Sequence, residues 1–350
     1  MKTLLIPCAG KSSRFPNMKP KWLLTHPDGE LMIQKAVSTI DFNDVDRVVV
    51  TIVRKQTVDY DAKVILQQAF ANTKLEICEL EDFTSSASET IVKTVEKMNI
   101  KGMVIIKDSD NVVNFEVPTS ETNAVVGVNL ANNSKIRNIP GKSFLIVNEQ
   151  SVLLDIVEKQ IVSNIICVGV YIISNVEEFI RVYRVLENCS VGELYISHVI
   201  SAMISSEKNI FQYIEGKDYE DWGTLEEWRT VQNKFRTYFV DVDGVLLKNS
   251  GKYGNLNWSN NNKVIKDNCE IVRKLQENGA QVIITTARPE LYRSELETLL
   301  NANGLYPTAI VMGLNHSARV LVNDFSPTNP YPSAIAINIP RDGVLKDYLK

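Results

Sequence analysis

The chain opens with Thr3-Leu4-Leu5-Ile6-Pro7-Cys8-Ala9-Gly10-Lys11-Ser12-Ser13-Arg14-Phe15, in which an apolar run passes directly into a turn of small residues. The apolar run predicts a buried strand. The turn after it exposes backbone N–H groups, which can hold phosphate oxygens. The residues expected to contact a bound nucleotide in this turn are Ala9, Gly10, Ser12 and Ser13.

Two basic residues accompany this turn. Arg14 lies within it and Lys21 follows in Lys19-Pro20-Lys21, so together they could neutralise a triphosphate. Neither common phosphate motif is present: Gly141-Lys142-Ser143 lacks the glycine that a P-loop has five residues earlier, and there is no G-x-G-x-x-G. The alternative interpretation of the stretch is a tight strand-to-helix turn with solvated charges.

Short apolar runs alternate with segments of helical period along most of the chain, which predicts an α/β architecture with mainly parallel strands. Amphipathic helices are expected at Gly29–Ile40 and Asn262–Asn278. A first series of strands is expected at Thr3–Ile6, Val48–Val53, Met103–Ile106, Val125–Asn129, Phe144–Val147 and Ile165–Ile173. A second series is expected at Thr237–Val240, Gln281–Thr285, Ala309–Val311, Arg319–Val322 and Ala334–Ile339.

The length of 350 residues suits two domains. The best boundary lies near Phe235, where an expected helix, Leu225–Lys234, ends and a new strand begins. We therefore expect two Rossmann-like α/β domains, residues 1–235 and residues 236–350.

Composition excludes some classes of partner. The formal net charge of -4 and the pI near 5.6 give no basic field for nucleic acid. The longest apolar stretch, Ile165–Ile173, is about half as long as a membrane span. The five cysteines form no C-x-x-C pair, which favours reduced, buried thiols. A cytoplasmic protein that binds neither nucleic acid nor membrane is expected, and its oligomeric state stays open.

The arrangement A-G-x-S-S-R-F…P-K resembles the opening motif of the sugar-phosphate nucleotidyltransferases, the pyrophosphorylase family with a GT-A type fold. Val104-Ile105-Ile106-Lys107-Asp108-Ser109-Asp110-Asn111 is similar to the metal-binding segment of that family, with Asp110 as the ligand and Asp108 as its neighbour. Asp221-Trp222-Gly223-Thr224 resembles the closing D-x-G-T motif. The resemblance implies that Asp110 and Asp221 hold Mg²⁺.

The resemblance also implies where the two substrates bind. The sugar phosphate is expected at Glu158, Lys159, Asn164, Gly169 and Glu193, which lie in segments similar to the E-K-P, S-N, G-x-Y and G-E motifs of the family. Gln160 stands where the family has proline. The nucleobase is expected near Ser86, in a segment that lacks the usual glycine, so the base stays undetermined.

A second acidic motif, Tyr238-Phe239-Val240-Asp241-Val242-Asp243-Gly244-Val245, begins the last third of the chain. Two carboxylates two residues apart project to the same side of an extended chain, and Gly244 permits a sharp turn. This run resembles motif I of the haloacid-dehalogenase-like phosphohydrolases. The resemblance implies that Asp241 is a nucleophile that forms an aspartyl phosphate and that Asp243 is the acid/base.

The other motifs of that family have counterparts further along. Thr286 stands where a strand-end hydroxyl hydrogen-bonds the phosphoryl group, and Arg319 stands where the family has its cation, usually lysine. Asp324 is similar to the acidic residue that holds Mg²⁺ together with Asp241 and Asp243. The short gaps between these motifs imply a fold without a cap domain.

The sequence thus predicts a bifunctional, Mg²⁺-dependent enzyme. One domain would transfer a nucleoside monophosphate from an NTP to a phosphorylated small molecule such as a sugar phosphate, with release of pyrophosphate. The other would hydrolyse a phosphomonoester. Consecutive steps towards an activated sugar for a surface polysaccharide would explain the fusion. The alternatives are a single active domain joined to a scaffold, or a nucleotide or sugar-phosphate sensor without turnover.

Overall fold

The computed structural model describes residues 1–133, 136–189, 192–206, 209–249, 258–259, 263–324, 326 and 333–349. Internal contacts divide the chain into two units, Met1–Trp228 and Arg229–Lys350. Helix α7 (Leu225–Lys234) runs from the first unit into the second, and the domain boundary expected near Phe235 lies at the far end of this helix.

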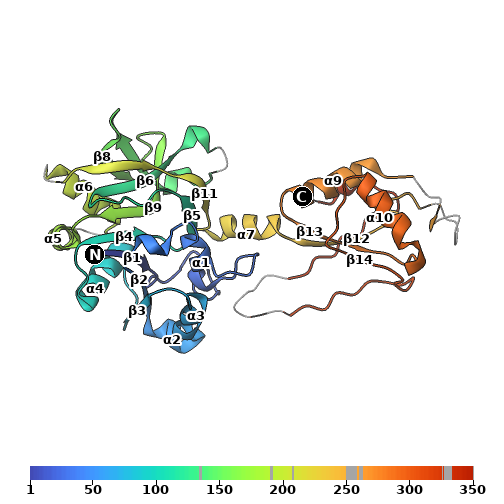
Figure 1. Ribbon diagram of the computed structural model, residues 1–350, viewed down its shortest axis with the longest axis horizontal. Coiled ribbons are helices and arrows are strands. Elements are labelled where there is room, and N and C mark those ends of the chain that lie inside the picture. Colours follow the sequence, from blue (N-terminus) through green and yellow to red (C-terminus); the bar gives the residue numbers. More distant parts are fainter. Residues whose placement is uncertain are drawn as a thin grey trace. The chain divides into compact units, whose positions relative to one another are not determined.

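The first unit is a mixed α/β fold (Figure 1). Its described strands are β1 Lys2–Pro7, β2 Arg47–Val53, β3 Leu75–Leu80, β4 Met103–Lys107, β5 Asn111–Asn114, β6 Asn123–Asn129, β7 Ser143–Val147, β8 Val152–Glu158, β9 Ile165–Ile173, β10 Phe211–Glu215 and β11 Lys217–Asp221. Its helices, besides the start of α7, are α1 Met32–Val37, α2 Arg54–Tyr60, α3 Ala62–Ala69, α4 Ala87–Met98, α5 Val176–Glu187 and α6 Ile196–Ser205.

Within the described residues, nine strands form one sheet in the order β3-β2-β1-β4-β9-β6-β10-β8-β7. Strands β1 to β4 pair in parallel, whereas β9 runs antiparallel to both β4 and β6. Beyond β4 this sheet is mainly antiparallel, apart from the parallel pair β6–β10, so the expectation of mainly parallel strands is wrong for that part of it. A small second sheet, β11-β5, places Asp221 opposite Asn111 and so joins the closing motif to the turn that carries Asp110.

The sheet is apolar on both faces because its central strands alternate between two cores. In β1, Leu5 belongs to one buried cluster, while Leu4 and Ile6 belong to the other. Successive side chains of a strand point to opposite faces, so a continuous apolar run fills both cores at once. This arrangement leaves the strand ends as the places where polar side chains can gather.

The second unit contains a described sheet of three parallel strands in the order β12-β13-β14 (Thr237–Asp241, Gln281–Thr285 and Ala309–Val311). Helices α9 (Lys266–Glu277) and α10 (Arg293–Ala302) accompany it. Its own core is formed by apolar residues of these strands and helices, including Val240, Val272, Ile284 and Leu296.

Two expected strands of the second unit are wrong. Arg319–Val322 and Ala334–Ile339 are not strands in the structure, and Val320 and Val322 are 81% and 90% exposed. High β-propensity stabilises a strand only when a neighbouring strand supplies hydrogen bonds and a packed face, and the described residues supply neither to these two segments. The helix expected at Gly29–Ile40 is also shorter, because a turn at Asp28 to Gly29 precedes it and α1 begins at Met32.

None of the described helices is both long and apolar enough to span a membrane. All five cysteines are free thiols, and all but Cys189 are buried.

Candidate functional site

The loop after β1 is shaped by its own polar groups. Ser12 has a positive φ of 52° and its hydroxyl accepts a hydrogen bond from the backbone N–H of Lys21 at 3.3 Å. Its carbonyl accepts from the N–H of Phe15 at 2.9 Å. Gly10 and Ser13 are exposed, whereas the carbonyl of Ala9 accepts from the N–H of Thr84. The loop is thus folded back so that Lys21 returns beside it.

Asp110 is the buried carboxylate on which the basic residues converge. Its side chain pairs with the ammonium of Lys21, and the guanidinium of Arg14 lies 3.8 Å away. Burial alone would raise the pKa of Asp110, but the charges of Lys21 and Arg14 outweigh it and hold that pKa well below its ordinary value. Asp110 is therefore a carboxylate at neutral pH.

Asp221 approaches Asp110 across Gly223. A Cβ on Gly223 would lie 3.1 Å from an oxygen of each carboxylate, so these two oxygens are at most twice that distance apart. The N–H of Trp222 donates to the carbonyl of Asp110 at 2.8 Å, which holds the two segments together. The structure thus brings together the two carboxylates that the sequence nominated as metal ligands.

Lys142 is a member of this group that sequence reasoning missed. Its ammonium pairs with the carboxylate of Asp221, and its side chain is only 15% exposed. Burial lowers the pKa of Lys142 against the opposing effect of the nearby acidic groups. The only signal in the sequence was the motif Gly141-Lys142-Ser143, which failed as a P-loop.

The carboxylates fit a magnesium ion. Mg²⁺ is commonly held in proteins by one or two carboxylates together with substrate phosphates and waters. Asp110 and Asp221 supply two carboxylates at one edge of the sheet, and their present partners are cations. In the described parts of the chain no cluster of three or more His, Cys, Asp or Glu side chains exists, so the phosphates of a substrate would complete the ligand set.

Asp108 faces away from this pair, towards Gly169 in β9. Its N–H donates to the carbonyl of Gly169 at 2.8 Å, and its carboxylate lies against the Cα of the glycine. Desolvation by burial and the charge of Asp110 raise the pKa of Asp108 to about 6. The two aspartates of the turn therefore differ in environment, and the structure separates the two roles that the sequence gave them.

Gly169→Ala is expected to destabilise the first unit by about 2–4 kcal/mol. Its φ is +70° and an added Cβ would lie 2.3 Å from an oxygen of Asp108, so strain and a clash act together. Urea unfolding measures the loss. Gly29→Ala is the control, because Gly29 also has a positive φ, of +96°, but nothing lies within 4 Å of its Cβ position. Equal losses in the two variants would contradict the clash with Asp108.

Part of the expected sugar-phosphate set gathers between the end of β8 and the start of α6. Glu158 accepts hydrogen bonds from the hydroxyls of Ser143 at 2.5 Å and Ser197 at 2.6 Å. The ammonium of Lys159 donates to the hydroxyl of Tyr195 and lies 4.1 Å from the centre of its ring. A cavity of about 390 Å³ borders this group, lined by Asp155–Glu158, Gln160, His198, Ser201, Ala202 and Ser205.

The other members of that set are spread more widely. Glu193 is exposed and shares the hydroxyl of Tyr195 with Lys159. Asn164 instead donates to the side chain of Asn129 at 3.2 Å, and its carbonyl accepts from the N–H of Leu130. The described contacts therefore tie Asn164 to the turn after β6 rather than to Glu158.

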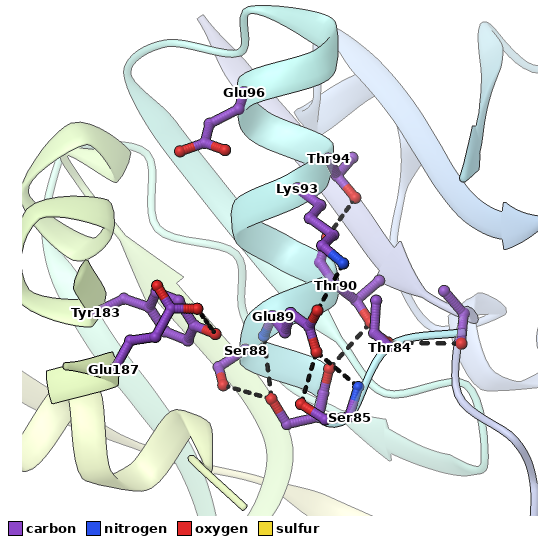
Figure 2. Close-up of polar contacts among 12 residues, drawn as sticks. Thr84, Ser85, Ser88, Glu89, Thr90, Lys93, Thr94, Glu96, Tyr183 and Glu187 are labelled. Carbon is purple, nitrogen blue, oxygen red and sulfur yellow. Dashed lines mark hydrogen bonds and ion pairs between the residues drawn. The ribbon is translucent and has the colours of Figure 1, made fainter. Parts of the chain in front are cut away.

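Ser86 caps helix α4. Its hydroxyl accepts from the N–H of Glu89 at 3.1 Å, and Glu89 in turn accepts from the N–H and hydroxyl of Ser85 (Figure 2). The first of these bonds satisfies an N–H group that the helix start leaves free, and the others hold the residue before the cap. Behind them, the hydroxyls of Thr84 and Thr90 lie 2.6 Å apart. The segment expected near the nucleobase is thus a helix start held by several hydrogen bonds.

In the second unit, polar groups gather at the carboxyl ends of β12 and β13. Asp241 ends β12 in register with Thr285. Arg288 binds Asp243 through two hydrogen bonds of 2.7 and 3.0 Å, and the side chain of Arg288 is only 3% exposed. The hydroxyl of Thr286 accepts from the N–H of Arg288 at 3.1 Å. Arg288 follows Thr286 by two residues, and nothing in the sequence indicates that it holds Asp243.

Asp241 has the environment of a partly desolvated carboxylate. Desolvation and the charge of Asp243 raise its pKa above the ordinary value, while the charges of Arg319 and Arg288 act in the opposite direction. Arg319 itself is exposed and donates to the carbonyls of Asn315 and Ser317. Its charge therefore reaches Asp241 although its hydrogen bonds are local.

The metal ligand set expected in the second unit is incomplete in the described contacts. Asp324 is exposed, and its contact in the structure is a backbone carbonyl that accepts from the hydroxyl of Ser333 at 3.0 Å. No described contact joins its carboxylate to Asp241, because Arg319–Val322 forms no strand beside β12. Asp243 is occupied by Arg288. The Mg²⁺ site that the resemblance implied in this unit therefore stays a prediction.

A cavity of about 660 Å³ lies beside this cluster, and sequence reasoning did not find it. Arg288 lines it together with Trp258, Ser259, Val264, the α10 residues Ser294, Glu295, Leu296, Thr298, Leu299 and Ala302, and Asn303, which follows the helix. The guanidinium of Arg288 also donates to the carbonyl of Trp258 at 3.3 Å.

No protein-family model matches the chain, and no curated protein matches it. Several solved structures do match part of the chain. A nucleoside-diphosphate-sugar pyrophosphorylase from Vibrio cholerae RC9 is 18% identical, covers 66% of this chain and 99% of its own, and has a TM-score of 0.56. A UDP-glucose pyrophosphorylase complexed with UDP-glucose is 18% identical, covers 67% of this chain and 97% of its own, and has a TM-score of 0.51.

A third structure, from Bacillus anthracis and described as a glucose-1-phosphate thymidylyltransferase in complex with sucrose, is 16% identical, covers 67% of this chain and 94% of its own, and has a TM-score of 0.52. Identities this low establish the fold alone. The expected haloacid-dehalogenase-like domain remains a prediction. About two thirds of the chain shares the fold of the sugar-nucleotide pyrophosphorylases.

Proposed function

We propose that the first unit transfers a nucleoside monophosphate from an NTP to a phosphorylated small molecule, in the class of sugar phosphates, and releases pyrophosphate. The observation that carries the proposal is the convergence of Arg14 and Lys21 on Asp110, with Asp221 beside it across Gly223. The fold shared with pyrophosphorylases supports it. The product would be an activated donor, for instance for a surface polysaccharide.

The chemistry follows from charge. A phosphate oxygen of the acceptor attacks the α-phosphorus of the NTP, a P–O bond forms, and the bond to the departing pyrophosphate breaks. Arg14 and Lys21 offset the negative charge that otherwise repels the two substrates. The backbone N–H groups of the loop after β1 would orient the triphosphate. Glu158 and Lys159 would orient the acceptor.

Mg²⁺, held by Asp110 and Asp221, would supply further neutralisation of the phosphate oxygens. No covalent protein intermediate is required, because the acceptor already carries the attacking oxygen. The residues of the chain thus bind and align two anions.

A matrix of the four NTPs against a panel of sugar phosphates, with Mg²⁺, tests this proposal. Pyrophosphate and inorganic phosphate are measured separately. We expect pyrophosphate release that requires both an NTP and a phosphorylated acceptor. Tight NTP binding by calorimetry without pyrophosphate release from any pair would instead favour a sensor.

We propose a second activity, phosphomonoester hydrolysis, for the second unit. Asp241, Asp243 and Thr286 at one edge of its parallel sheet support it, as does the raised pKa of Asp241. The carboxylate of Asp241 would take the phosphoryl group while the alcohol leaves with a proton from Asp243, and water would then hydrolyse the aspartyl phosphate to release phosphate.

Asp241→Asn separates the two activities. The amide is a poor nucleophile, so we expect phosphate release to fall to background while pyrophosphate release stays within twofold of the wild type. The phosphomonoesters tested include the acceptor that gives the most pyrophosphate in the matrix of NTPs and sugar phosphates. Retained phosphate release would remove Asp241 from the mechanism. A parallel loss of both activities would refute independent sites.

A further inference from the structure

Lys142 lies between the residues expected to bind the acceptor, Glu158 and Lys159, and the carboxylate of Asp221, which is expected to hold the metal. It precedes β7, after a short 3-10 turn at Ile139–Gly141. Its carbonyl accepts a hydrogen bond of 3.0 Å from the N–H of Lys159, so the two lysines lie opposite each other across the β7–β8 hairpin. Ser143, the next residue, donates to Glu158. The backbone of Lys142 is thus fixed to the acceptor side.

The side chain of Lys142 extends instead to Asp221, where the nucleotide and its metal are expected to bind. Its ammonium pairs with Asp221 and lies 5.9 Å from the ring centre of Tyr219. The charges of Asp110 and Arg14 also act on it. One residue therefore joins the hairpin that carries Glu158 and Lys159 to the carboxylates expected to hold the metal.

The pairing of Lys142 with Asp221 cannot persist unchanged once a divalent cation occupies the same carboxylate. Two positive groups at one carboxylate repel each other, and Asp221 would prefer the ion with more charge. An ammonium displaced from Asp221 keeps three donors and a flexible stem. A phosphate of the acceptor, arriving between Lys159 and Asp221, is the nearest anion that would receive it.

We propose that Lys142 is a catalytic residue that exchanges Asp221 for the phosphate of the acceptor when metal binds. The inference rests on the proposed nucleotidyl transfer and adds a residue to it. Lys142 would hold the attacking phosphate, whereas Arg14 and Lys21 act on the triphosphate. A structural ion pair between Lys142 and Asp221 is the competing explanation, and it predicts that loss of the lysine weakens every property of the site.

The test is Lys142→Met, measured in three ways on the full chain. Binding of Mn²⁺ alone, followed by electron paramagnetic resonance, is expected to tighten about five- to tenfold, because Asp221 loses a competing cation. Binding of orthophosphate to the Mn²⁺-loaded protein, followed by calorimetry, is expected to weaken about 10- to 100-fold. The turnover number for pyrophosphate release should fall at least as much.

Lys55→Met is the matched control, since the ammonium of Lys55 pairs with Asp59 at 2.8 Å on α2, away from these residues. It should change none of the three values. Weaker Mn²⁺ binding in Lys142→Met would overturn the exchange, and unchanged orthophosphate binding would overturn the contact with phosphate. A wild type that released no pyrophosphate would refute the proposed function, while the two binding measurements would still decide the role of Lys142.

Discussion

Asp110→Asn is expected to lower pyrophosphate release about a thousandfold, the largest effect on activity that the structure predicts. The change removes the charge on which Lys21 and Arg14 converge and one of the two carboxylates that would hold Mg²⁺. The size and shape of the side chain are nearly unchanged. Steady-state pyrophosphate release at saturating NTP and acceptor measures the effect.

The control for this variant is Asp59→Asn, which removes an exposed carboxylate that pairs with Lys55 on α2. It should leave the rate within a factor of two. A rate above a tenth of the wild type in Asp110→Asn, with the fold intact by circular dichroism, would contradict the assignment of Asp110.

Arg288→Leu is expected to lower stability by about 3 kcal/mol, a loss confined to the second unit. The side chain of Arg288 is 3% exposed and its removal leaves Asp243, itself only 18% exposed, without its two hydrogen bonds. Breaking a buried pair from one side is costly because the remaining charge stays desolvated. Hydrogen exchange followed by mass spectrometry should show peptides of β12 and β13 exchanging about 100-fold faster.

Two comparisons make this result specific. Peptides of β1 and β2 in the same variant should keep their exchange rates, because they belong to the other unit. Arg293→Leu, which removes a partly exposed arginine that pairs with Glu290 and Glu297, should cost under about 0.5 kcal/mol. Similar protection in Arg288→Leu and Arg293→Leu would show that the pair with Asp243 is not stabilising.

The sequence predicted the parts of the fold that rest on local pattern. Apolar runs such as Thr3–Ile6 and Val48–Val53 became β1 and β2 because each fills two cores at once. Strands with mixed exposure, such as β3 and β8, were missed because only two residues of each are buried. The relative direction of the strands could not be predicted, since no local sequence pattern shows that β9 runs antiparallel to β4.

The candidate site also contains some residues that the sequence predicted and others that it did not. Asp110 and Asp221 were predicted because each lies in a motif, and the structure places them together. Lys142 and the pairing of Arg288 with Asp243 were not, because their partners are 79 and 45 residues away in sequence. Arg319–Val322 was predicted as a strand from its local pattern, but it has no neighbouring strand among the described residues and its valines are exposed.

The most direct test of the central claim is ³¹P nuclear magnetic resonance of the wild-type reaction with the best NTP and acceptor pair. Nucleotidyl transfer predicts two coupled phosphorus signals from a new diphosphate linkage, in an amount equal to the pyrophosphate released. Pyrophosphate accompanied by free nucleoside monophosphate, or no new diphosphate signal with any pair, would contradict the account.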